Sequence, residues 1–226
     1  MNEIGKDGGM MKYEVVLFDL DGTIIDPKEG ITKSVQFALA KMGVTVENCD
    51  TLESFIGPPL QLSFQEQFGF SIQQANEAIS YYRERYKPTG IYENTVYEGM
   101  AELLAELKSK GYKLVIATSK PTVFAQNIAE HYDFARYFDG IIGSELDGTR
   151  TLKAEVIEEG LRQLGSYETS KCIMIGDRKY DMIGAKANAM DCVGVTYGYG
   201  SEQELAEAQA TYIVQTVPQL RDVLMQ

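Results

Sequence analysis

Histidine and cysteine are scarce in this sequence. His131 is the single histidine in 226 residues, which excludes both a metal site built from several histidines and catalysis by a histidine pair. The cysteines are Cys49, Cys172 and Cys192, an odd number without a Cys-x-x-Cys pair. Cys172 and Cys192 lie in apolar runs typical of buried thiols. We therefore expect a protein of the reducing cytoplasm.

Basic segments and long apolar segments are also missing. The chain has 21 Lys and Arg against 33 Asp and Glu, a formal net charge of -12, and no run rich in Lys or Arg. Nucleic acids and anionic membranes both need a basic footprint, so we expect neither as a partner. No stretch approaches the ~18 apolar residues of a membrane helix. Residues 1–11 lack the apolar region of a signal peptide, and we leave them out of the fold prediction.

The stretch from residue 13 to residue 23 combines a strand with acidic residues. Val15 to Phe18 is an apolar run of strand length, rich in β-branched and aromatic residues. Asp19, Asp21 and Gly22 follow directly. Residues i and i+2 of an extended chain point to the same side, which places both carboxylates together at the carboxyl end of a buried strand. A turn explains Asp-x-Asp-Gly equally well, but two close carboxylates commonly bind a divalent metal.

The rest of the chain alternates between strand and helix patterns. Further strands are predicted at residues 112–117, 141–142, 172–175, 192–196 and 212–214. Amphipathic helical patterns separate them, which is typical of an α/β fold with a doubly wound parallel sheet of Rossmann-like type. Only helical patterns occur between residues 27 and 92. We therefore predict a core domain of residues 12–26 and 93–226, with a small all-α domain of residues 27–92 inserted after the first strand.

Polar residues follow several of the predicted strands. Thr118 and Ser119 come after the second strand and Asp177 after a later one, while Lys153 begins a helix. Each has an ordinary explanation, since Thr118 suits a helix cap, Lys153 a solvated side chain and Gly176-Asp177 a turn. Together they place carboxylates, hydroxyls and an ammonium group at one edge of a parallel sheet, where open α/β sheets bind their ligands.

These residues resemble the four motifs of the haloacid dehalogenase-like (HAD) phosphohydrolases. Asp19–Thr23 is similar to the first motif, Thr118 to the second and Lys153 to the third, and Gly176–Asp181 has the form G-D-x-x-x-D of the fourth. The order and spacing agree over nearly the whole chain. The insertion at residues 27–92 lies where the family carries its type-1 cap domain.

The resemblance implies a role for each motif residue. Asp19 would be the nucleophile that forms an aspartyl-phosphate, and Asp21 the general acid and base. Thr118, Ser119 and Lys153 would contact the transferring phosphate. The family's dehalogenases lack the acid at the position of Asp21, because a halide leaves without a proton. The resemblance therefore implies a phosphatase that acts on a small phosphorylated metabolite.

The resemblance also implies a Mg²⁺ site. The ion would be bound by Asp19, by the backbone carbonyl of Asp21 and by Asp177, and Asp181 would orient a water on the metal. Mg²⁺ would also offset the repulsion between a carboxylate nucleophile and an anionic substrate in this acidic chain. We expect the protein to act as a monomer or a weak homodimer.

Three segments bear on the substrate. Phe55–Leu60 resembles the specificity loop of phosphoglycolate phosphatase caps, although a helix–helix turn explains Gly-Pro-Pro equally well. The segments Ala117–Pro121, Ile56–Pro59 and Gly176–Lys179 resemble the 5′-nucleotidase-like branch more closely. Arg83 or Arg85 could face an anion, but a solvated helix face is the simpler interpretation.

Two other functions stay open. A mutase like β-phosphoglucomutase shares all four motifs, although such enzymes typically carry Glu-Asp where this chain has Gly176-Asp177. A phospho-aspartate binding and signalling module, like a receiver domain, also carries a phosphorylated Asp beside Mg²⁺. Against that module stand Asp21, which would hydrolyse the phosphate, and the inserted domain.

Overall fold

The structure is a computed structural model that describes residues 11–165 and 167–226. Residues 1–10, for which no signal peptide is expected, lie outside the described part. The strands are β1 (Val15–Phe18), β2 (Ile25–Asp26), β3 (Thr95–Val96), β4 (Lys113–Pro121), β5 (Gly140–Ser144), β6 (Cys172–Gly176), β7 (Asp191–Val195) and β8 (Tyr212–Val214). The α-helices are α1 (Lys28–Lys41), α2 (Leu60–Phe68), α3 (Ile72–Tyr86), α4 (Met100–Ser109), α5 (Thr122–His131), α6 (Lys153–Leu164), α7 (Lys179–Ala187), α8 (Glu202–Glu207) and α9 (Val217–Leu224). Short 3-10 helices are η1 (Cys49–Phe55), η2 (Gly90–Tyr92), η3 (Ala135–Tyr137) and η4 (Thr169–Lys171).

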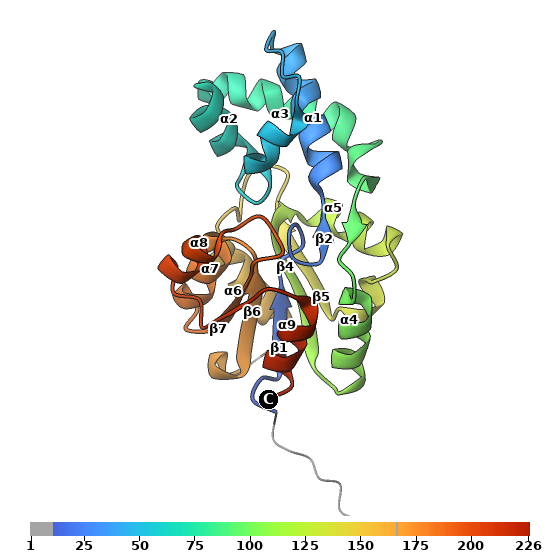
Figure 1. Ribbon diagram of the computed structural model, residues 1–226, viewed down its shortest axis with the longest axis vertical. Coiled ribbons are helices and arrows are strands. Elements are labelled where there is room, and N and C mark those ends of the chain that lie inside the picture. The colour runs from blue at the N-terminus through green and yellow to red at the C-terminus, as the bar shows by residue number, and fades with distance from the viewer. Residues whose placement is uncertain (1–10, 166) are drawn as a thin grey trace, which may run out of the picture.

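A parallel sheet forms the lower part of the molecule in Figure 1. Its strand order is β5-β4-β1-β6-β7-β8, with every neighbouring pair parallel. β1 pairs with β4 on one side and with β6 on the other. The predicted α/β fold with a doubly wound parallel sheet is confirmed.

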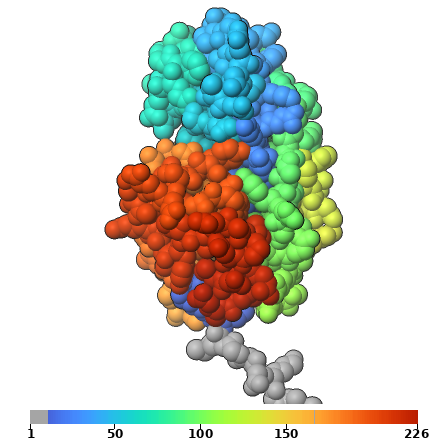
Figure 2. Space-filling model, in the orientation of Figure 1, coloured from blue at the N-terminus to red at the C-terminus, as the bar shows by residue number. Residues whose placement is uncertain are grey.

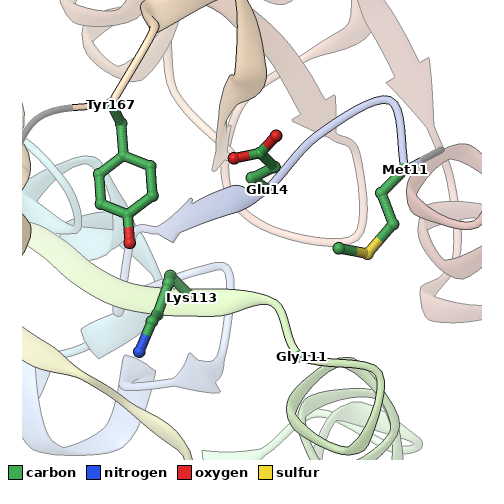
Figure 3. Close-up of a pocket in the computed structure, with 5 residues that line it drawn as sticks. All are labelled: Met11, Glu14, Gly111, Lys113 and Tyr167. Atoms are coloured by element: carbon green, nitrogen blue, oxygen red, sulfur yellow. The ribbon is translucent and has the colours of Figure 1, made fainter.

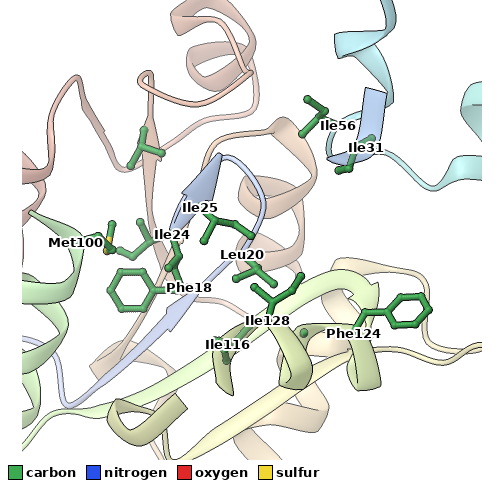
Figure 4. Packing of buried hydrophobic residues seen from close by; sticks show 14 of the residues in the cluster. Phe18, Leu20, Ile24, Ile25, Ile31, Ile56, Met100, Ile116, Phe124 and Ile128 are labelled. Carbon is green, nitrogen blue, oxygen red and sulfur yellow. The ribbon is translucent and has the colours of Figure 1, made fainter. Parts of the chain in front are cut away.

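Side chains of β1 alternate between the two faces of this sheet. Val16 and Phe18 belong to a core cluster that includes residues of α4, α5 and α9, whereas Val15 and Leu17 pack with residues of α6 and α7. Figure 4 shows Phe18 among Ile24, Met100 and Ile116 in the first cluster. Because both faces are covered by helices, all four residues of β1 are apolar and buried.

Residues 27–92 hold only helices, which Figure 1 places beyond the carboxyl ends of the strands. α1, α2, α3, η1 and η2 make up this part. At its base the two-residue strands β2 and β3 pair antiparallel, Ile25 with Val96 and Asp26 with Thr95. The sequence did not predict this ribbon, because two residues are too short to show a strand period. The exact boundaries of the two domains stay a prediction.

Some local predictions differ from the structure. β4 continues beyond residue 117 to Pro121, whose Cα pairs with Ser144 of β5, so α5 begins at Thr122 and Thr118 is not its cap. Ser201 caps α8 by accepting a hydrogen bond from the N–H of Glu204 (3.0 Å), and the Glu204 carboxylate contacts Arg178 and Lys179 after β6. Among the described residues, no helix is long and apolar enough to span a membrane.

Candidate active site

The strand register brings the predicted site residues together. Phe18, the last residue of β1, pairs with Ile116 of β4 and with Ile175 of β6. Asp19 follows Phe18 directly, and Thr118 and Asp177 each lie two residues beyond its partners. All three side chains are buried, with 5%, 2% and 1% of their residue surface exposed.

Lys153 lies between two of the carboxylates. Lys153 is the first residue of α6. Its Nζ lies 2.9 Å from Asp19 Oδ1, 2.8 Å from Asp181 Oδ1 and 3.0 Å from the carbonyl oxygen of Ala117. Burial alone would lower the pKa of Lys153, but Asp181 and Asp19 raise it above its ordinary value. Lys153 is therefore a charged group that neutralises part of the carboxylate cluster.

Asp19, Asp177 and Asp181 form a buried cluster of carboxylates. One oxygen from each lies within 4.8 Å of the others. Burial raises the pKa of Asp177 well above its usual range, and the charges of Asp181 and Asp19 raise it further. Asp177 Oδ2 accepts a hydrogen bond from the N–H of Tyr199 (2.8 Å), whereas Oδ1 has no hydrogen-bond or ion-pair partner among the described residues. A buried oxygen of this kind is suited to bind a cation.

Asp181 has a different environment. Its Oδ1 pairs with Lys153, and its Oδ2 accepts a hydrogen bond from the N–H of Arg178 (3.1 Å). Burial raises the pKa of Asp181 to about 6, against the lowering effect of Lys153. Both oxygens of Asp181 are therefore engaged, one by Lys153 and one by the backbone of Arg178. Asp181 is the third carboxylate of the cluster. The third metal ligand predicted from the sequence is instead the backbone carbonyl of Asp21.

The Asp21 side chain points to another cation. Lys120 Nζ lies 2.8 Å from Asp21 Oδ1 and donates a hydrogen bond to the hydroxyl of Tyr86 (2.6 Å). Lys120 comes from the end of β4 and Tyr86 from α3, so this contact joins the helical part to the sheet. Burial raises the pKa of Asp21, and Lys120 acts in the opposite direction. Asp21 therefore shares an ion pair with a lysine that the first motif does not contain.

Gly22 is required by the close packing at the end of β1. Its φ is +79°, and a Cβ atom there would lie 2.2 Å from Asp177 Oδ2. Only glycine fits both the left-handed backbone and this approach. The glycine of the Asp-x-Asp-Gly pattern thus makes room for a carboxylate more than 150 positions away.

The other candidate residues lie in varied places. Ser119 is half-buried, and its carbonyl accepts a hydrogen bond from the Ser144 hydroxyl (2.8 Å). Arg85 makes a two-bond ion pair with Glu93 (2.9 and 3.0 Å), which links α3 to the chain after η2. Arg83 makes a long contact with the carbonyl of Leu146 (3.4 Å). Arg85 is therefore committed to the structure of the helical part.

Three contacts of the site had no clear signal in the sequence. Lys120 stands next to the second motif, but its partner Tyr86 is 34 positions away. Tyr199 contributes its backbone N–H to Asp177, which any residue could do. Arg178 reaches the carbonyl of Ile56 (2.8 Å), 122 positions away.

A hollow of about 340 Å³ lies at the opposite edge of the sheet. Its lining comes from the amino ends of β1 and β4, with Glu14 and Lys113 among the residues drawn in Figure 3. The carboxylate cluster lies at the carboxyl ends of the same strands, so the two places are separate.

Comparison with known families identifies the family of this chain. The family model for haloacid dehalogenase-like hydrolases matches residues 16–195. The chain belongs to this family. Its members among the known proteins include phosphatases that resemble the whole chain closely.

Individual relatives cover nearly the full length. A 5′-nucleotidase of Pseudomonas aeruginosa is 50% identical over 95% of this chain and 96% of its own. The crystal structure of a protein from Clostridium acetobutylicum, described as a predicted phosphatase, is 49% identical and has a TM-score of 0.91, covering 94% of this chain and 98% of that chain. Tyrosine-protein kinase PtkA of Mycobacterium tuberculosis is 34% identical over 93% of this chain and 72% of its own. The HAD chain described here is thus an enzyme of the phosphatase group.

Proposed function

We propose that this HAD chain is a Mg²⁺-dependent phosphomonoester hydrolase that works through an aspartyl-phosphate. The observation that carries the proposal is the environment of Asp19. Its carboxylate lies at the end of β1, 2.9 Å from the Lys153 ammonium and beside Asp177, which has an unpartnered buried oxygen. The Asp19 carboxylate is thus held in one orientation, next to the Lys153 ammonium and the cation-binding oxygen of Asp177. A carboxylate that attacks phosphorus needs such a fixed orientation and nearby positive charge.

The chemistry is two displacements at phosphorus. In the first, a carboxylate oxygen of Asp19 forms a bond to phosphorus while the ester P–O bond breaks, and Asp21 gives its proton to the leaving alkoxide. In the second, a water attacks the phosphorus of the aspartyl-phosphate while the bond from phosphorus to the Asp19 oxygen breaks. Asp21 takes the proton of that water, Asp19 is restored as a carboxylate, and inorganic phosphate leaves. Lys153 offsets the negative charge that gathers on the phosphoryl oxygens, and Thr118 and Ser119 hold these oxygens.

The residues present fit a magnesium ion. Asp19 and Asp177, whose oxygens lie in the carboxylate cluster, would hold it together with the backbone carbonyl of Asp21. Asp181, the third carboxylate of the cluster, would orient a water on the ion. Oxygen ligands of this kind are those that Mg²⁺ prefers. When bound, the ion supplies positive charge that lets an anionic phosphate approach the Asp19 carboxylate.

We further propose that the substrate is a small phosphorylated metabolite, with 5′-nucleotides as the first class to test. The support is the 50% identity to a 5′-nucleotidase over almost the full length of both chains. Asp19 and Asp21 are 5% and 8% exposed beneath the helical part, which suits a small substrate better than a folded protein. The three free cysteines agree with work in a reducing cytoplasm. The oligomeric state that we propose is a monomer or a weak homodimer.

The test is phosphate release from purine and pyrimidine 5′-monophosphates, 2-phosphoglycolate and sugar phosphates, with Mg²⁺ and with EDTA. We expect metal-dependent release, and its loss in Asp19→Asn, which keeps the size of the side chain. Release from phosphoglycolate alone would replace the nucleotide assignment and keep the mechanism. Isomerisation of a sugar phosphate without phosphate release would favour a mutase, and phosphate transfer to a protein from ATP would favour the kinase-like relative.

A further inference from the structure

Arg178 connects the two parts of the molecule. It lies in the loop after β6, next to Asp177. Its Nη1 donates a hydrogen bond to the carbonyl of Ile56 (2.8 Å) in the helical part, and its Nε donates to Glu204 Oε1 of α8 (3.0 Å). The side chains of Arg178 and Glu204 are 16% and 21% exposed. The guanidinium group is therefore a largely buried bridge between a helix of the core and a loop of the cap.

The surroundings of Arg178 are shaped for this bridge. Gly57, the residue after Ile56, has a φ of +103°, and a Cβ atom there would lie 3.0 Å from Cγ of Arg178. The loop thus packs its glycine on the apolar stem of the arginine. Glu204 Oε1 also accepts a hydrogen bond from the N–H of Lys179 (2.8 Å). The carboxylate is therefore held in place by a contact that does not involve the arginine side chain.

The backbone of the same residue contacts the carboxylate cluster. The N–H of Arg178 donates to Asp181 Oδ2 (3.1 Å), and Asp181 Oδ1 pairs with Lys153. Lys153 in turn pairs with Asp19. One residue is therefore hydrogen-bonded to the loop above the site through its side chain and to the site itself through its backbone.

The hydrogen bond from Arg178 to Ile56 lies where the cap rests on the core. The carboxylates of the site are buried, and in the face shown in Figure 2 the atoms of residues 50–70 lie directly on those of the carboxyl-terminal third of the chain. Arg178 and Ile56 belong to these two groups. Their hydrogen bond is present in the closed arrangement and would be lost when the cap moves away.

We propose that Arg178 is a positioning residue, a latch that holds the loop Phe55–Leu60 closed over the site. This rests on the proposed function only in that the site beneath the loop is where a phosphate ester reacts. A guanidinium group is suited to the task because its planar fork donates to Ile56 and to Glu204 at once. A lysine in its place has a single nitrogen, and we expect it to keep the charge but hold the loop less firmly.

Hydrogen exchange of the full-length protein tests the latch directly. In Arg178→Met, we expect amides of the peptides covering residues 52–60 to exchange roughly tenfold faster, because a hydrogen bond from a charged donor is lost from the closed state. Amides of α3 and of the parallel sheet should be unchanged. Arg162→Met is the matched control: it removes an arginine whose partner, Glu159, lies on the same helix and is not part of the cap. Wild-type exchange at residues 52–60 in Arg178→Met would overturn the proposal.

Kinetics provide the second arm. Where the wild-type protein releases phosphate, we expect Arg178→Met to raise KM several-fold with a smaller change in kcat, since apparent affinity falls with the fraction of closed protein. The KM of Arg178→Lys should lie between those of the wild type and Arg178→Met. Arg178→Lys is also the variant for hydrogen exchange if Arg178→Met does not fold. An unchanged KM in both variants would contradict the latch. If the wild-type protein hydrolysed no monoester, the proposed function would fail, and hydrogen exchange would still decide whether Arg178 holds the loop.

Discussion

Charge is unevenly matched at the buried end of β1. Asp19, Asp177 and Asp181 contribute three carboxylates, and Lys153 is the one cation that the structure pairs with two of them. A divalent ion would balance the remainder. Burying these carboxylates together costs stability, which the binding of a divalent ion would offset.

Asp21→Asn should separate the two displacements. With p-nitrophenyl phosphate, whose leaving group needs no proton, the first displacement should proceed and the second should slow by about 10²–10⁴-fold, because no base remains for the water. We expect a burst of nitrophenol equal to the enzyme concentration, followed by slow turnover. Rapid-mixing kinetics would measure it. Steady turnover at the wild-type rate would remove Asp21 from the mechanism.

Gly22→Ala tests the close packing of the first motif. Both Gly22 and Gly43 have a positive φ, +79° and +80°, but an added Cβ meets Asp177 Oδ2 at 2.2 Å in the first and nothing within 4 Å in the second. Gly43→Ala should lose about 1–2 kcal/mol from backbone strain and keep full activity. Gly22→Ala should lose more stability and also its phosphate release. Urea unfolding and the phosphate assay would show it, and equal losses in the two variants would contradict the packing argument.

At the level of elements, the site depends on three strands that end, and one helix that begins, at the same edge of the sheet. β1, β4 and β6 are adjacent and parallel, so the register of the sheet brings Asp19, Thr118 and Asp177 together although they lie far apart in the sequence. α6 adds Lys153 at its first turn. Each element is ordinary in itself. The chemistry arises because the right-handed crossovers return every strand in the same direction.

Lys153→Met should show how strongly α6 is tied to the sheet. The variant leaves Asp19 and Asp181 buried without their cation, which typically costs about 3–5 kcal/mol. Arg162→Met, at the exposed end of the same helix, should change stability little. Urea unfolding of the two variants without Mg²⁺ gives the comparison. A loss in Lys153→Met no larger than in Arg162→Met would mean that the ion pairs do not stabilise the fold.

For the whole molecule, the cap and the core meet through cations of the core. Lys120 contacts Tyr86 of α3, and Arg178 contacts Ile56. Lys120 lies at the end of β4, close to Thr118, and Arg178 lies in the loop after β6, next to Asp177. The position of the cap and the state of the site are therefore linked through the same residues.

Mg²⁺ should stabilise the folded protein as a whole. At about 100 times its Kd, a ligand that binds only the native state adds about 2.7 kcal/mol, which would raise Tm by about 5 to 10 °C in a chain of this size. Asp177→Asn should melt higher than the wild type in EDTA, because one of the repelling carboxylates is neutral, and it should lose most of the rise in Mg²⁺. Thermal scans of both proteins in both buffers provide the test. An equal Mg²⁺ shift in the two would place the ion elsewhere.

The local pattern of the sequence determined the fold class and the motifs. The buried apolar run Val15–Phe18, the alternation of strands and helices and the order of the polar residues at strand ends are all properties of neighbouring residues, and the parallel sheet and the family were predicted from them. The meeting of Asp19, Thr118 and Asp177 at one edge was predicted as well, because parallel strands carry their carboxyl ends to one edge.

The tertiary structure alone decided the contacts between distant segments. The pairing of Asp21 with Lys120, the contact of Tyr86 with the same lysine and the bridge from Arg178 to Ile56 depend on where a cap helix and a cap loop come to rest on the core. The β2–β3 ribbon depends on the same placement. Contacts between side chains that are tens of positions apart produce no periodic pattern in the sequence. They are set by how the cap packs on the core and not by neighbouring residues.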